Sequence, residues 1–440
     1  MLFYDAPFVA FRLINLGELQ IAEHRYGSFI TQMVPLAGSW LQLPLKLILI
    51  GYNLSFPVFY LLVGLLLIRW RAYPFVILLA LYLSLFVSNA YFWTNNEVHQ
   101  GTAWLMLWMG FLWRAQEQEY NPWIVLCGSL PLMFLAVFTH PLLIFSTVFL
   151  WVFLLVDKRF RKFPTWLLLS LSTVLFLLVF IKQQMSRGGW YDASKIEQIT
   201  KANAGEMLQA FGNEMSLTFL KQMAVNYWLF PLLLLFGLFT LLQQRRRWQL
   251  LWTLGSLTAF YLMLCLSFPD WVTFHAESEW MTFSLIGVTP FVFYGLPCYT
   301  AMRAAGLLAL IFVVRLLYMA ADAPKFVKRQ ELRHQMVAQM RAKGLTKVAL
   351  LDARQELSFD GLPPWALPVE SMYASVFQGD TVQRTVIVID SGKAAQVENL
   401  PVAQLAAPWE LYWPEKWNSY YFHPDTVHRY QVMTLEELMR

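Results

Sequence analysis

Long apolar segments, repeated between residues 45 and 319, constrain the fold of this chain more than any other feature of its sequence. A helix needs about twenty apolar residues to cross the hydrocarbon core of a bilayer. About ten segments approach that length, near residues 45–68, 75–93, 99–113, 122–139, 141–156, 164–182, 226–242, 250–268, 281–298 and 304–319. Since 58% of the residues are hydrophobic and only 14% are charged, the sequence predicts an all-α polytopic membrane domain of about ten transmembrane helices.

The positively charged residues indicate how this domain is oriented, because short loops rich in Lys and Arg stay on the cytoplasmic side. Every second loop contains such residues: Arg69, Arg71, Arg114, Lys158, Arg159, Arg161, Lys162, Arg245, Arg246, Arg247 and Arg303. The intervening short loops, near 94–98, at His140 and near 269–280, contain neither Lys nor Arg. The pattern predicts a multi-pass protein of a bacterial cytoplasmic membrane, with residues 1–44, the loop 183–225 and the chain from about 320 facing outward.

An outward N-terminus is unusual for such a protein, so we expect the chain to begin downstream of a first transmembrane helix. Residues 1–44 are too polar to span, and their pattern predicts an outward-facing helical segment along the membrane interface. The loop 183–225 predicts one or two surface helices that could cover a cavity. Residues 45–319 form the predicted transmembrane domain.

From residue 320 the composition becomes that of a small soluble domain, predicted to lie outside the cytoplasm over 320–440. A charged helix is expected near 323–342, ending at Gly344, and "LPVESMYASVFQ" predicts a second helix. The segments "KVALLD" and "TVIVID" predict buried strands. We therefore expect a small α/β domain.

Several functional classes find no support in the sequence. The net charge of +5 comes from short basic clusters beside apolar segments, so nucleic acid is not an expected partner. Cys127, Cys265 and Cys298 lie in or beside apolar segments without a CxxC spacing, which predicts neither a disulfide nor a zinc site. "SGK" at 391–393 lacks the glycine-rich loop that should precede a phosphate-binding lysine.

Polar residues at the predicted outer ends of the spans are candidates for chemistry. Glu97 and His99, in "TNNEVHQG", could supply a base or metal ligands. The alternative is a solvated turn in which Asn95 or Asn96 caps the next helix. His140, followed by Pro141, either points into a cavity or satisfies a backbone carbonyl freed by the proline.

Further candidates lie near the last spans and near the N-terminus. Arg315, near the outer end of the last span, could hold a lipid phosphate or reach the interface with its long side chain. Arg25 allows the same interpretation. The segment "PDWVTFHAESEW" places His275 and Glu279 one helical turn apart, but no third ligand stands at a diagnostic distance for a metal.

Taken together, "FYDAPF", "AEHRYGSFITQMVPLAGSWLQLP", the many spans, the outward loop 183–225 and the outward α/β domain resemble a polytopic glycosyltransferase of the C superfamily. The resemblance implies a polyprenyl-phosphate sugar donor, an outward-facing active site, and an acidic residue in the first outer loop that activates the acceptor hydroxyl. By position that residue is Asp5, with Glu23 as the second choice.

The resemblance implies inverting transfer of a hexosyl or pentosyl group to an envelope acceptor. Asp5, assisted by Glu97 or His99, would take the acceptor proton. Arg25 or Arg315 would steady the phosphate leaving group, with His140 as a further lipid-phosphate ligand. A divalent cation could assist, although the sequence offers no firm set of metal ligands.

Two other functions stay open. A non-catalytic subunit would dock its outer domain on a protein partner through an apolar patch, which the segments 363–377 or 408–417 could provide. A transporter of a lipid-linked glycan would need charged residues inside several spans, and the predicted spans are nearly free of charge.

Overall fold

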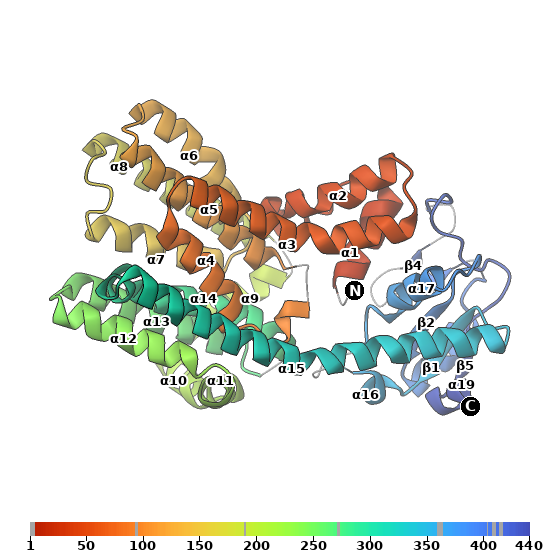
Figure 1. Cartoon of the computed structure of the whole chain (residues 1–440). Coiled ribbons are helices and arrows are strands. Elements are labelled where there is room, and N and C mark those ends of the chain that lie inside the picture. The colour runs from red at the N-terminus through yellow and green to blue at the C-terminus, as the bar shows by residue number, and fades with distance from the viewer. Residues whose placement is uncertain are drawn as a thin grey trace.

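The structure, a computed structural model, is described here over residues 5–92, 96–188, 191–270, 273–358, 364–402, 404–406, 411–412 and 417–440. A helical bundle forms one end of the molecule and a small α/β domain forms the other (Figure 1). A single long helix, α15, runs from the bundle into the α/β domain.

Five helical segments within these ranges are long and apolar enough to cross a membrane, as expected of a multi-pass membrane protein. They are α3 (Leu45–Arg69), α8 (Thr165–Ser186), α13 (Arg247–Ser267), the segment Ala276–Cys298 and α15 (Ala301–Ala342). The fourth segment is most of α14 (Thr273–Pro290), continued by a π-helical turn and a 3-10 turn. A sixth span results if the bent pair Ala204–Val225 and Leu229–Gln243, which meet at 89°, is counted as one.

The prediction of about ten spans is therefore wrong by this measure. Three of the apolar segments form helices of 13, 16 and 14 residues: α4 (Tyr73–Leu85), α6 (Pro122–Val137) and α7 (Leu143–Val156). At 1.5 Å per residue they measure roughly 20–24 Å, less than the ~30 Å of a hydrocarbon core. A hydropathy count includes every apolar residue of a segment. In the structure some of those residues lie in turns, so the helices are shorter than the apolar segments. Two further helices, α5 (Glu97–Glu117) and α12 (Leu229–Gln243), complete the bundle.

The spans differ in how far the protein itself buries them. In the segment Ala276–Cys298, 89% of the most apolar stretch is buried, against 22% in α8 and 17% in α15. The α14 helix packs on α4, α7, α12 and α13, which places it inside the bundle. The α8 and α15 helices instead present most of their apolar surface outward, as helices that face lipid do.

Three helices form the predicted outer loop 183–225: α9 (Tyr191–Lys201), α10 (Ala204–Gln209) and α11 (Glu214–Val225). Asparagines begin the last two. The Asn203 side chain accepts from the backbone of Gly205 and Glu206, and Asn213 accepts from Ser216. These caps satisfy backbone N–H groups that the first helical turn leaves without partners. The segment is helical as predicted, but it forms three helices in place of one or two.

The last predicted span and the predicted charged helix near 323–342 are one continuous helix of 42 residues, α15. It contains Pro324 and ends at Ala342, two residues before Gly344, whose backbone has φ +67°. Glycine tolerates that left-handed conformation, so the predicted end of the helix is confirmed. The predicted domain boundary at 319/320 falls inside α15. This helix therefore belongs to both the bundle and the α/β domain and connects them without a flexible linker.

The α/β domain contains a parallel sheet with the strand order β2-β1-β5. The predicted strands are confirmed as β1 (Lys347–Leu351) and β2 (Thr385–Ile389), and the predicted helix as α17 (Leu367–Phe377). The smaller elements are α16 (Arg354–Leu357), α18 (Ala394–Glu398), β3 (Leu405–Ala406), β4 (Leu411–Tyr412), β5 (Gln431–Met433) and α19 (Leu435–Met439). Apolar residues cover both faces of this sheet, as the continuous apolar strands indicate.

The N-terminal segment is helical, as predicted, and it packs against the α/β domain. Its helices are α1 (Asp5–Leu16) and α2 (Phe29–Trp40). Phe11 of α1 contacts the rings of Trp417 and Phe422 near the other end of the chain. The Asn418 backbone N–H donates to Asn15 Oδ1 at 2.8 Å. The two ends of the sequence thus hold the loop after α1 in place beside the bundle.

Candidate functional site

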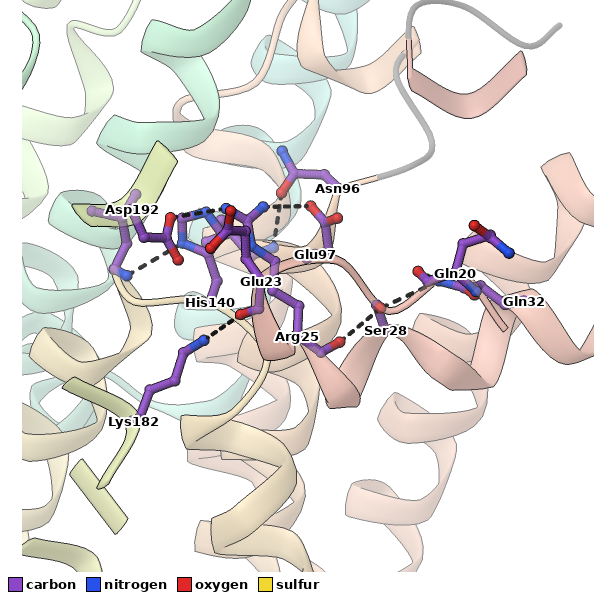
Figure 2. A network of polar contacts seen from close by, with 12 residues as sticks. Gln20, Glu23, Arg25, Ser28, Gln32, Asn96, Glu97, His140, Lys182 and Asp192 are labelled. Carbon is purple, nitrogen blue, oxygen red and sulfur yellow. Dashed lines mark hydrogen bonds and ion pairs between the residues drawn. The ribbon is translucent and has the colours of Figure 1, made fainter. Parts of the chain in front are cut away.

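Arg25, in the loop after α1, lies at the centre of a group of charged side chains (Figure 2). Its Nη2 donates to Asp192 Oδ1 at 3.1 Å, and its Nη1 lies 3.6 Å from Glu97 Oε2. The Arg25 and Asp192 side chains are 14% and 5% exposed, whereas that of Glu97 is 30% exposed. The Arg25–Asp192 pair is therefore shielded from solvent, and the Glu97 side is more open. We call the group the Arg25 cluster; its members are Asp5, Glu23, Arg25, Glu97, His140, Lys182 and Asp192.

The backbone that carries Arg25 has an unusual conformation. Glu23 and His24, the two residues before it, have φ values of 48° and 56°, in the left-handed region that residues other than glycine seldom adopt. Such residues persist where the surrounding structure holds them, and they are common at functional sites. Here the Glu23 carbonyl accepts a hydrogen bond from Lys182 Nζ at 2.8 Å. Glu23, the second-choice base, thus joins the cluster through its backbone carbonyl.

Lys182, near the end of α8, is the second cation of the cluster, and its residue is fully buried. Its charge acts on Asp192, Arg25 and Glu23. A buried ammonium group at the end of an apolar span is costly, and polar groups in such places commonly serve a function. Arg25 and Lys182 are thus the two cations of a cluster that also contains the carboxyl groups of Asp5, Glu23, Glu97 and Asp192.

Asn96 at the start of α5 confirms the predicted helix cap, and Glu97 beside it lies next to Arg25. Asn96 Oδ1 accepts from the Val98 backbone N–H at 2.9 Å, so Asn96 is the helix cap. Asn95, the other predicted cap, lies outside the described residues. Glu97 is the first residue of the helix, and its carboxylate pairs with Arg25. The first turn of α5 therefore contains both the helix cap, Asn96, and a member of the Arg25 cluster, Glu97.

His99 is placed by the structure on another side of α5 from Glu97. Residues two apart on a helix point in nearly opposite directions, so these two side chains cannot share one metal or one substrate atom. The buried His99 ring contacts the Tyr82 hydroxyl through Nδ1 at 2.9 Å. That contact satisfies a polar group inside the bundle. The structure does not bring His99 into the Arg25 cluster.

Asp5, the first residue of α1, is exposed but has protein on its remaining sides. Partial burial, and then the negative charge of Glu97, raise the pKa of Asp5 to about 7, against the opposing effect of Arg25. Asp5, Arg25 and Glu97 are thus electrostatic neighbours, although Asp5 and Glu97 are far apart in the sequence. A carboxyl group that titrates near neutrality can accept a proton in a reaction at physiological pH.

His140, in the turn between α6 and α7, lies beside the two cations. Burial, followed by the charges of Arg25 and Lys182, lowers its pKa well below the ordinary value for histidine. The imidazole is therefore neutral, and its Nδ1 lies 3.2 Å from the Leu142 backbone N–H, which donates to it. The partner is a backbone N–H and not the carbonyl freed by Pro141 that the structural alternative predicted, while the position beside Arg25 is the one that the functional alternative needs.

Buried hydroxyl groups from α3 extend the cluster. The hydroxyls of Tyr52 and Tyr60 have no hydrogen-bond partner among the described residues, and the charge of Glu97 acts on both. Such buried donors generally have a partner, in the protein or from outside it. A ligand that carries hydroxyl groups could accept hydrogen bonds from the Tyr52 and Tyr60 hydroxyls and donate one to the Asp5 carboxylate.

Arg315 lies elsewhere, between α15 and the end of α4. Its guanidinium donates to the backbone carbonyls of Ser84, Val87 and Asn226, and it lies over the rings of Tyr227 and Tyr318. Arg315 is only 1% exposed, and these three carbonyls accept hydrogen bonds from each of its guanidinium nitrogens. The predicted phosphate ligand is thus a structural residue, which satisfies carbonyls left by the end of a helix.

Glu277 on α14 completes this second network. Its carboxylate accepts from the backbone N–H groups of Ser88, Asn89 and Ala90, at 3.0, 3.1 and 2.7 Å, and from the Tyr227 hydroxyl at 2.7 Å. Arg315 and Glu277 therefore fix the chain after α4 from two sides, one through carbonyls and one through N–H groups. The side chain of His275 lies outside what the structure describes.

Lys182 and Asp192 are the two cluster residues that the sequence interpretation missed. A signal existed for Lys182, a charged residue closing an apolar segment of about twenty residues. Asp192 stood among other acidic residues of the outer loop, and nothing local distinguished it. Only the packing of α9 shows that it meets Arg25, which is 167 positions away.

Among the described residues, no group of three or more His, Cys, Asp or Glu side chains is arranged to hold a metal ion. Comparison of the chain with models of known protein families, with curated proteins and with solved structures finds no match.

Proposed function

We propose that the chain is an integral-membrane glycosyltransferase that transfers a hexosyl or pentosyl group from a polyprenyl-phosphate donor to an envelope acceptor. The reaction would take place on the extracytoplasmic face of a bacterial cytoplasmic membrane. One observation carries the proposal: a carboxyl group that titrates near neutrality, Asp5, is an electrostatic neighbour of Arg25, and Arg25 in turn is a neighbour of a second cation, Lys182, although these residues are far apart in sequence. A base and an anion-binding group are the two parts that such a transfer requires.

In the proposed step, the Asp5 carboxylate takes the proton of an acceptor hydroxyl. The hydroxyl oxygen attacks the anomeric carbon of the sugar, and the bond between that carbon and the phosphate oxygen breaks. Both bonding electrons leave with the phosphate, so polyprenyl phosphate is released and the configuration is inverted. Asp5 then returns its proton to water.

Arg25 and Lys182 would stabilise the negative charge that develops on the phosphate. The Glu97 contact to Arg25, at 3.6 Å, is longer than the Asp192 contact, at 3.1 Å. A phosphate that approaches from the more exposed Glu97 side could therefore displace the weaker partner while Asp192 keeps the guanidinium oriented. The unpartnered Tyr52 and Tyr60 hydroxyls would bind sugar or acceptor oxygens.

The test uses the full chain in proteoliposomes, with a panel of radiolabelled polyprenyl-phosphate hexoses and pentoses and an extract of envelope glycans as acceptor. Wild type should release polyprenyl phosphate and label the acceptor. Asp5→Asn should reduce transfer by about 10²- to 10⁴-fold, the usual contribution of a general base. Glu18→Gln is the matched control, because Glu18 is an exposed carboxylate in the same segment.

Equal transfer by wild type and Asp5→Asn would overturn the assignment of Asp5. Absence of transfer across the whole panel, with protein that elutes as a folded monodisperse species, would instead favour the non-catalytic subunit. The structure gives one reason to rank that alternative second. Val369, Met372 and Tyr373, from the segment expected to form a docking patch, are buried against α1 and α3 of the same chain.

A further inference from the structure

The face of α9 that lies on the bundle carries two charged side chains. The residues of this face are buried or half-buried and follow the spacing of one side of a helix: Asp192, Lys195, Ile196 and Ile199. Asp192 and Lys195 are one turn apart, so their side chains extend from the same side of α9. The two isoleucines offer little apolar surface by themselves. The charged pair therefore takes part in holding α9 on the bundle.

Asp192 reaches the Arg25 cluster from this face. Its Oδ1 accepts from Arg25 Nη2 at 3.1 Å (Figure 2), and its charge also acts on Lys182. Of the two carboxylates that contact Arg25, Asp192 is the closer and the less exposed. The position of α9 therefore influences the orientation of the Arg25 guanidinium.

Lys195 reaches the end of α13 from the same face of α9. Its Nζ donates to the Ser267 carbonyl at 2.8 Å and lies 4.4 Å from the centroid of the Phe268 ring. Ser267 is the last residue of α13, and the carbonyls of a last helical turn have no partners within the helix. The helix dipole also favours a cation at this end. Lys195 thus anchors α9 on α13.

Glu279 on α14 lies near this anchor. It is 6% exposed, and its Oε2 has no hydrogen-bond partner among the residues that the structure describes. The charge of Lys195 acts on it. Glu277, on the same helix, is different, because four donors satisfy its carboxylate. A buried carboxylate that lacks donors is costly unless a cation lies near it, and Lys195 is that cation.

We propose that Lys195 and Glu279 are positioning residues for the Arg25 cluster. The Ser267 carbonyl and the charge of Glu279 hold Lys195, Lys195 fixes α9 on the bundle, and α9 holds Asp192 against Arg25. Arg25 is thereby kept in the orientation that receives the donor phosphate. The effect on the donor rests on the proposed glycosyl transfer, whereas the docking of α9 is measurable without it.

The first measurement is hydrogen–deuterium exchange of the α9 amides in the full chain in detergent, followed by mass spectrometry. Lys195→Met should speed this exchange by about tenfold, the effect of losing one hydrogen bond from a charged group. Exchange in the middle of α13 should stay as in wild type, which shows that the bundle is folded. Lys195→Arg should restore slow exchange, because a guanidinium can donate to the same carbonyl. Lys201→Met is the control, since Lys201 is exposed and pairs with Glu197 of the same helix.

The second measurement is transfer in proteoliposomes at varied donor concentration. Lys195→Met and Asp192→Asn should each raise the KM for the polyprenyl-phosphate donor by about tenfold with little change in kcat, because each releases Arg25. The double variant should be no worse than either single variant, since both residues act through α9. Glu279→Gln should raise the KM by less, because Lys195 keeps its contact to Ser267.

The outcomes separate this proposal from the proposed function. Wild-type exchange of α9 in Lys195→Met would overturn the anchor. Faster exchange with an unchanged donor KM would overturn the positioning role, and so would additive losses in the double variant. Absence of transfer by wild type would overturn the proposed function instead, and the exchange of α9 would still decide whether Lys195 holds this helix.

Discussion

Arg315, which is buried, and Arg25, which is half-buried, were both candidate phosphate ligands in the sequence, and the structure separates them by what they contact. Arg315 donates to three backbone carbonyls and packs over two tyrosine rings. Arg25 contacts the carboxylates of Asp192 and Glu97 and has a second cation, Lys182, as a neighbour. The first arrangement satisfies groups that are fixed in the fold, whereas the second holds charges that a ligand can rearrange.

The difference teaches how to interpret a buried cation in a membrane protein. Carbonyl partners belong to the backbone and cannot leave, so an arginine that they saturate stabilises the fold. Carboxylate partners on side chains can move, and a pair left partly open at Glu97 keeps a route for an anion to enter. We therefore expect the two arginines to differ in which property their removal changes.

The largest effect is expected for Arg315→Met. Three buried carbonyl groups, of Ser84, Val87 and Asn226, would lose their charged donor, at a cost on the order of 3–5 kcal/mol in the free energy of unfolding. Thermal unfolding and the yield of monodisperse protein in detergent measure this. Arg303→Met, at an exposed position near the start of the same helix, is the control. Stability equal to that of the control would show that the carbonyl contacts do not support the fold.

Next in size is the effect of Arg25→Met on transfer, which should fall by about 100-fold in kcat/KM, the usual effect of losing one donor to developing charge. Its stability should fall by only about 1–2 kcal/mol, because Glu97 can be hydrated and Lys182 remains near Asp192. Activity and unfolding are measured on the same preparation. Loss of folded protein as severe as in Arg315→Met would remove the distinction between the two arginines.

The two glutamates of these networks provide a matched pair. Glu277→Gln replaces an acceptor of four hydrogen bonds by an amide, whose NH₂ group would face N–H donors. It should lower the free energy of unfolding by about 2 kcal/mol and leave activity per folded molecule unchanged. Glu97→Gln should leave stability nearly unchanged and shift the pH dependence of transfer to lower pH, because the negative charge of Glu97 helps to raise the pKa of Asp5. If Glu97→Gln destabilised the protein and Glu277→Gln changed only transfer, the Glu277 network would be the functional one and the Arg25 cluster the structural one.

The smallest effect, about tenfold per pH unit, is expected in the pH dependence of kcat/KM. The Asp5 base works only when ionised, and its pKa is raised to about 7. Transfer should therefore fall as the pH drops below 7 and level off above it. The residual activity of Asp5→Asn should lack this step. A wild-type profile that is flat between pH 5 and 8 would contradict the role of Asp5 as the base.

Much of the fold could be predicted from local patterns. The strands β1 and β2, the helix α17 and the end of α15 before Gly344 lie where the sequence indicates. Each is marked by residues next to one another in the chain, such as an apolar strand or a glycine after a helix. The number of spans was not predictable in the same way, because helices such as α4 and α7 end sooner than their apolar segments suggest.

The candidate site was predicted in part. Asp5, Glu97, Arg25 and His140 were named as outward polar residues, and the structure makes them neighbours. His99 and Arg315 were named on the same grounds, but their side chains satisfy Tyr82 and three backbone carbonyls instead. A sequence shows that a polar residue lies at the end of an apolar segment. The direction of its side chain depends on which helices pack beside it.

The sequence by itself determined that this chain forms apolar helices suited to a membrane and a small α/β domain, because hydropathy and strand pattern are local properties. Only the tertiary structure decided which charges meet. Arg25 and Asp192 are 167 positions apart, and α8, α9 and the loop after α1 must all pack before Lys182 lies beside them. Burial then gives these charges their strength, since an ion pair shielded from water interacts far more strongly than one in solvent.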